Sequence, residues 1–124
     1  MSPAAVLIVA FVVADSGVEA AVHDRAGTLA SFRFTNTQQG IVALARWMDN
    51  LPSAGKYTTA HACIVSLRSD EGELYSTPVF QFAYEMPGDM SVWSRAKLQR
   101  VVGEHSTSTT EHFLIECERE GRIK

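Results

Sequence analysis

The side chains that could do chemistry are dispersed along the chain, and acidic residues occupy the most suggestive places. Asp15 follows a long apolar run, and Glu111 begins the last segment. Asp70 and Glu71 lie together in a charged turn. Each also has an ordinary structural explanation, because Asp15 can form a turn before Ser16, residues 70–71 can be solvated, and Glu111 can interact with a helix dipole. Carboxylate chemistry therefore depends on whether the fold brings these groups together.

The spacing of the serines and histidines does not indicate a catalytic site. Ser16 and Ser106 lie outside the pattern of a nucleophile elbow, which disfavours acyl transfer. His61 stands in an apolar segment, where a histidine is more often a core residue than a ligand. No metal-ligand spacing joins the four histidines, which are His23, His61, His105 and His112.

The two cysteines, Cys63 and Cys117, are predicted to be buried free thiols. Both lie in apolar contexts, and neither belongs to a metal-binding or redox spacing. Free thiols persist in reducing compartments, so we expect a cytoplasmic protein. The apolar run at residues 4–14 has no preceding Lys or Arg and is too short to span a bilayer, so we expect a buried strand and no membrane association.

Length and composition predict one domain over residues 1–124. The chain has 124 residues, of which 46% are hydrophobic, which is enough for one ordinary core. With 14 acidic residues against 11 Lys and Arg, the formal charge is -3, and the basic residues occur singly. Nucleic-acid binding would therefore need a patch assembled by the fold. Arg95, Lys97 and Arg100 lie on a predicted helix and would face either phosphates or solvent.

The first three elements are predicted to form an antiparallel meander. Residues 4–14 are continuously apolar, which is typical of a central strand covered on both faces. Residues 18–23 alternate in polarity, and residues 28–34 return with apolar side chains on one face. Between them, residues 24–27 end in a glycine that can close a hairpin.

A helix is predicted next, beginning at Asn36 or Thr37 and ending near Leu51. Either of the first two residues can cap it, and Asn36 with Gln39 is close to a capping box. Residues 58–67 then form another mostly apolar strand. Because such a strand is covered on both faces, we place it beside the first strand.

The second half of the chain is predicted to contain an aromatic edge strand and two helices. Aromatic residues alternate over residues 74–84, and Pro78 favours an edge because it cannot donate to a ladder. Residues 91–102 are predicted to form a helix capped by the serine at its start. For residues 107–121 two interpretations are open, a helix capped by Thr110 or an alternating strand, and we favour the helix.

The first half of the chain resembles the RuvC-like N-terminal domain of DEDD transposases, in the ribonuclease H-like superfamily. The first strand ends in Asp15, a glycine-containing hairpin follows, and the run Phe34-Thr35-Asn36-Thr37 opens a helix that contains Gly40 and Leu44. A Thr-Asn pair also opens the first helix of ribonuclease H. The resemblance covers residues 6–51. It implies an α/β fold, a ribonuclease H-like mixed sheet whose first three strands are antiparallel, with helices packed on it.

This resemblance also implies a magnesium-dependent site. In that superfamily, carboxylates at the ends of the first and fourth strands and on a late helix hold two divalent metals, which stabilise attack on a phosphodiester. Asp15 matches the first position and Glu111 the late helix, so both would be Mg²⁺ ligands. Asp70 or Glu71, in the turn after the fourth strand, would complete the catalytic group.

Two positions depart from the pattern of that superfamily. Gly40 stands where ribonuclease H has a helix carboxylate, and Ser66 stands near the place of the carboxylate on the fourth strand. One hypothesis is a transposase-related protein that binds nucleic acid and, if active, cleaves phosphodiesters or transfers strands. Another is a non-catalytic relative that forms a homodimer through its aromatic strand. A third is an unrelated α+β domain with a small-molecule cavity.

Overall fold

A computed structural model of the protein describes residues 6–23, 29–51, 59–67, 71–86, 88–102, 110, 113–117 and 119. Residues 113–117 are helical. The other elements, in chain order, are β1 Val6–Ala14, β2 Gly17–His23, β3 Leu29–Phe34, α1 Gln38–Asp49, β4 Thr59–Ser66, the 3₁₀ helix η1 Glu71–Ser76, α2 Pro78–Glu85, β5 Gly88–Trp93 and α3 Arg95–Val102.

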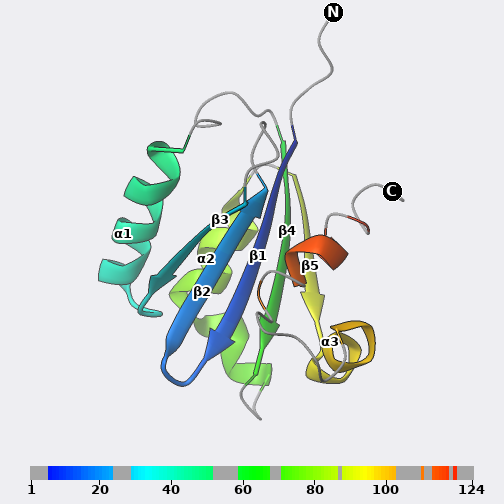
Figure 1. Ribbon diagram of the computed structural model, residues 1–124. Coiled ribbons are helices and arrows are strands. Elements are labelled where there is room, and N and C mark those ends of the chain that lie inside the picture. Colours follow the sequence, from blue (N-terminus) through cyan, green and yellow to red (C-terminus); the bar gives the residue numbers. More distant parts are fainter. Residues whose placement is uncertain are drawn as a thin grey trace, which may run out of the picture.

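The strands form one mixed sheet in the order β3-β2-β1-β4-β5 (Figure 1). β1, β2 and β3 are antiparallel neighbours, so the predicted meander is confirmed, while its turn at residues 24–27 lies outside the described residues. β4 pairs parallel with β1, at its predicted place, and β5 pairs parallel with β4. The α/β class with a mixed sheet is therefore confirmed, and β1 is its central strand.

β1 is apolar at nearly every position because both faces of the sheet are covered. Phe11 and Val13 belong to a core that includes residues of α1 and α2, whereas Ala10 and Val12 belong to a second core with Leu98 of α3 and residues 113–117. In Figure 1, α2 passes behind the strands and the short red helix lies in front of them. Successive side chains of β1 thus enter different cores, so the side chains on both faces of the strand must be apolar.

The start of α1 shows why both predicted caps are polar. Thr37 is the N-cap, and its Oγ1 accepts a hydrogen bond from the Gly40 N–H at 3.1 Å. Asn36 acts elsewhere, because its Oδ1 accepts from the N–H of Val79 at 3.0 Å. Val79 lies in the first turn of α2, where the local N-cap Thr77 makes no side-chain cap hydrogen bond. Asn36 therefore supplies the missing acceptor and ties the beginnings of the two helices together.

The predicted aromatic edge strand over residues 74–84 is wrong, because η1 and α2 cover this segment. Pro78 is at the first position of α2, where its missing N–H breaks no helical hydrogen bond. Val79 and Ala83 are buried at a helical spacing of four. The physical reason lies in the sheet, since two neighbouring parallel strands such as β4 and β5 need a crossover connection, which a helix usually supplies.

The predicted helix at residues 91–102 begins later than expected, because Ser91 lies in β5. Ser94 caps α3 instead, with its Oγ accepting from the N–H of Lys97 at 3.0 Å. Gly88 opens β5 with a φ of +136°, and a Cβ at this position would collide with the backbone of Ala60 on β4. The close approach of β5 to β4 at this position therefore requires glycine.

The C-terminal segment packs on the second face of the sheet. The helix favoured for residues 107–121 is confirmed at residues 113–117. Phe113 is fully buried, and its ring meets that of Trp93 edge-on with 5.1 Å between centroids. Cys63 and Cys117 are buried as predicted, but the prediction of free thiols is wrong, because they form a disulfide with Cα atoms 6.0 Å apart. A sequence separation of 54 residues gave no sign of this contact.

Candidate functional site at the carboxyl edge of the sheet

The carboxyl ends of β1 and β4 meet at one edge of the sheet. Val13 pairs with Ser66, and the N–H of Leu67 donates to the Val13 carbonyl oxygen at 2.8 Å. Asp15 comes one residue after β1. Because β3 runs in the same direction as β1, Thr35 also lies at this edge. In α/β sheets, the carboxyl ends of strands are where ligands usually bind.

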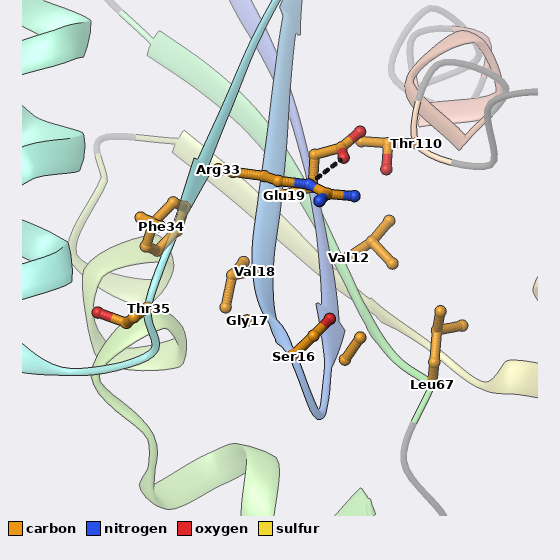
Figure 2. A pocket seen from close by; sticks show the side chains of 11 residues that line it. Val12, Ser16, Gly17, Val18, Glu19, Arg33, Phe34, Thr35, Leu67 and Thr110 are labelled. Atoms are coloured by element: carbon orange, nitrogen blue, oxygen red, sulfur yellow. Dashed lines mark hydrogen bonds and ion pairs between the residues drawn. The ribbon is translucent and has the colours of Figure 1, made fainter.

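An open pocket of about 530 Å³ lies at this edge (Figure 2). Its walls come from the ends of β1 and β3, the start of β2, the residue after β4 and the C-terminal segment. The lining residues are Val12, Ala14, Ser16, Gly17, Val18, Glu19, Arg33, Phe34, Thr35, Leu67 and Thr110. The pocket therefore combines an apolar floor with hydroxyl and charged groups.

Glu19 and Arg33 form the charged part of this pocket. Val12, Glu19 and Arg33 are neighbours across β1, β2 and β3, and Arg33 Nε lies 3.2 Å from Glu19 Oε2. The Arg33 side chain is 84% exposed and that of Glu19 is 29% exposed. An exposed ion pair contributes little to stability, so its main consequence is to present a guanidinium to solvent beside the pocket. No sequence motif singles out this pair, although hairpin alternation places both residues on one face.

The carboxylates expected at the site are only partly within the described residues. Asp15 is exposed just after the end of β1, and it is not among the described side chains that line the pocket. Glu71 opens η1, but its side chain is not described, and Asp70 and Glu111 lie outside the described residues. The convergence of these four carboxylates therefore stays a prediction.

The structure explains one of the departures from the ribonuclease H pattern. A Cβ added to Gly40 would collide with the carbonyl oxygen of Thr35. The first helix thus packs so closely on the chain before it that no carboxylate side chain fits at this position. Ser66, at the end of β4, is 3% exposed. It is a small buried hydroxyl near the position at which the resemblance implies an acidic residue.

A second group of potential ligands lies deeper in the same face of the sheet. His61 and Cys63 are two residues apart on β4, so their side chains share a face. Cys117 reaches them from residues 113–117, and the ligand atoms of the three side chains lie within 4.8 Å of one another. Sequence spacing could not reveal this group, because its third member comes from a distant segment.

Two surfaces outside the pocket carry exposed basic or aromatic side chains. On α3, Arg95 and Arg100 are exposed, while Lys97 Nζ lies 4.0 Å from the centroid of the Trp93 ring. On η1 and α2, Tyr75 and Tyr84 are 57% and 67% exposed. Both rings contact Phe80, with centroids 4.9 and 6.4 Å away. We call Tyr75, Phe80 and Tyr84 the aromatic face.

Family models and curated protein sequences do not provide a relative of this chain. No model of a known protein family matches the chain. A search of curated protein sequences also finds no match. Within the described ranges, no helix is long and apolar enough to cross a membrane.

Proposed function

We propose that the chain is a ribonuclease H-like domain, related to the RuvC-like domain of transposases, and that it binds nucleic acid. One observation carries the proposal. The strand order β3-β2-β1-β4-β5, with an antiparallel meander and then two parallel strands, agrees with the resemblance of residues 6–51 and extends it beyond them. Asp15 at the end of β1 supports the same relationship.

The described carboxylates alone are too few to form a site for cleavage. At the end of β1 and in the pocket they are Asp15 and Glu19, and Glu19 pairs with Arg33. A pair of Mg²⁺ ions needs several carboxylates around a common point, so Asp70, Glu71 or Glu111 would have to complete the set. With that set complete, bound Mg²⁺ would supply charge stabilisation at a phosphodiester.

Among the residues that the structure describes, Arg33 is the cation best placed to contact a phosphate at this edge. Its guanidinium is exposed beside a pocket that also presents the Ser16 and Thr35 hydroxyls. Arginine binds phosphate oxygens through a planar fork of donors, and hydroxyls commonly bind phosphates as well. Because the chain carries a net charge of -3, such a local patch has to provide the attraction.

Fluorescence anisotropy with a labelled four-way DNA junction, an RNA–DNA hybrid and duplex DNA tests this proposal. We expect saturable binding at low salt to at least one of them. Arg33→Gln should weaken it and reduce the slope of log K against log salt by about one. Arg46→Gln removes the same charge from the exposed surface of α1 and should have little effect. Absence of saturable binding to all three probes would overturn the proposal.

Calorimetric titration with Mg²⁺ and Mn²⁺ tests separately whether the chain has a metal site that includes Asp15. Saturable binding that Asp15→Asn abolishes would support a metal site at the end of β1 and justify nuclease assays. No binding at millimolar metal would refute the catalytic form of the proposal while leaving nucleic-acid binding to the anisotropy experiment.

The aromatic face favours a second candidate function, self-association. Tyr75 and Tyr84 expose large rings that contact a third, and tyrosines are enriched at protein interfaces. Light scattering over a concentration series would detect a dimer. Tyr84→Glu should then shift it to monomer, whereas Val42→Glu, at an exposed position on α1, should not. A chain that is monomeric at all concentrations would exclude this candidate.

A further inference from the structure

We propose that His61, Cys63 and Cys117 bind a Zn²⁺ ion when the Cys63–Cys117 disulfide is reduced. The ligand atoms of the three side chains lie within 4.8 Å of one another. In the part of the chain that the structure describes, no other group of three or more His, Cys, Asp or Glu side chains is close enough to share an ion. The site is separate from the pocket at the carboxyl edge, and metal binding there does not require that the chain bind nucleic acid.

The distances suit tetrahedral zinc. His61 Nε2 lies 3.7 Å from Cys63 Sγ. With Zn–S bonds of about 2.3 Å and a Zn–N bond of about 2.0 Å, a tetrahedral ion holds a sulfur and a nitrogen about 3.5 Å apart. The two β4 side chains are therefore already within about 0.2 Å of the separation that the ion requires. Cys117 supplies the third ligand, and a fourth position stays open for water.

Burial favours a divalent cation over a monovalent one. His61 is 4% exposed, and both cysteines are fully buried among apolar residues that include Ala10, Val65 and Phe113. A buried charge is costly unless it is balanced. Two thiolates and a neutral imidazole cancel the charge of Zn²⁺, whereas Cu⁺ would leave one negative charge in the core. Thiolate and imidazole are also the ligands that zinc prefers.

Conversion of the disulfide form into the zinc form requires a reductant, and a dithiol can supply the electrons and protons. The dithiol transfers two electrons and two protons to the Cys63–Cys117 bond and becomes a disulfide itself. Zn²⁺ then displaces the two thiol protons and forms two Zn–S bonds and one Zn–N bond. Before the metal binds, the Cys117 thiol can donate to the carbonyl oxygen of Val9, 3.6 Å from its sulfur.

The disulfide and the zinc ion would hold the same two parts of the fold together. Each links β4 to residues 113–117. Thr110, which lines the pocket at the carboxyl edge, comes shortly before this segment in the chain. Zinc would therefore keep the C-terminal segment docked in a reducing environment, where the disulfide is lost.

Metal titration of the oxidised and reduced full-length chain tests the site. The protein is reduced with dithiothreitol, which is then removed without oxygen, and Co²⁺ is added. We expect one Co²⁺ per reduced chain, with a sulfur-to-cobalt charge-transfer band that Zn²⁺ removes and two protons released per Zn²⁺. The oxidised chain should show no such band. His61→Gln and Cys63→Ser should weaken binding at least about 100-fold, because even changes to the partners of ligands cost about 10–100-fold. His23→Gln should not weaken it.

The comparison of oxidised and reduced wild-type protein keeps the test valid if a variant fails to fold. Reduction could also unfold the wild-type chain, and circular dichroism would detect this. Refolding on addition of Zn²⁺ would then support the site, because structural zinc couples binding to folding. The proposal is overturned if the reduced chain stays unfolded with Zn²⁺, if it binds Co²⁺ no better than the oxidised chain, or if folded His61→Gln binds as tightly as wild type.

Discussion

Reduction of the Cys63–Cys117 disulfide should lower the free energy of unfolding by about 4 kcal/mol when no metal is present. The bond joins residues 54 positions apart. In the chain-entropy model, closing a loop of this length removes about 14 cal/mol/K from the unfolded chain, which is about 4 kcal/mol at 25 °C. Both sulfurs lie in the core, so reduction changes the solvent exposure of the native state little. The unfolded chain therefore carries most of the effect.

Urea unfolding followed by tryptophan fluorescence, with and without dithiothreitol, measures this difference. EDTA is included so that metal cannot stabilise the reduced chain. With a denaturant slope of about 2 kcal/mol/M, the midpoint should fall by roughly 2 M. A chain carrying both Cys63→Ala and Cys117→Ala should not respond to the reductant, which controls for effects of dithiothreitol itself.

A shift of less than about 0.5 M would refute this reasoning, because it would correspond to only about 1 kcal/mol at that slope. Thiol titration of the denatured chain without reductant gives an independent check. Two reactive thiols per chain would mean that the bond does not form in solution, and none would confirm that it does.

Three further substitutions test contacts that position the helices and the C-terminal segment. Asn36→Ala removes the acceptor for the Val79 N–H and should cost about 1–2 kcal/mol in chemical denaturation, whereas Asn36→Asp keeps the acceptor and should cost less. Gly40→Ala should lower the melting temperature although alanine favours helices by about 1 kcal/mol, because its Cβ would collide with the Thr35 carbonyl; a higher melting temperature would contradict this close packing. Phe113→Ala should cost about 3–5 kcal/mol because the ring is fully buried, and an unchanged denaturation midpoint would mean that the C-terminal segment is not docked.

Local patterns were sufficient where one physical constraint dominated. The apolar runs of β1 and β4 predicted interior strands because both faces of these strands are covered. Asp15 could therefore be placed at a strand end from hydrophobic patterning alone. Over residues 74–84, by contrast, alternating aromatics fitted a strand equally well. The choice of helix came from the parallel pairing of β4 with β5, which is a property of the whole sheet.

Some residues of the pocket could be predicted from local sequence patterns, and others could not. Glu19 and Arg33 face each other across one hairpin, so alternation and register could have identified them. Thr110 lines the same pocket from a segment more than 70 residues further along the chain. No short-range pattern encodes that approach, because it depends on how residues 113–117 pack against the sheet.

The sequence by itself determined the central strands, the antiparallel meander, a helix that begins at Asn36 or Thr37 and the position of Asp15. These features follow from hydrophobic periodicity and capping, which act over a few residues. Only the tertiary structure decided that Asn36 caps a second helix, that Gly40 leaves no room for a side chain, and that Cys117 meets His61 and Cys63. The contacts of Asn36 and Cys117 join segments far apart in the chain, and the packing of helices on both faces of one sheet creates them. The Gly40 contact joins near neighbours, but it depends on how the chain bends at Thr35 as it enters the helix.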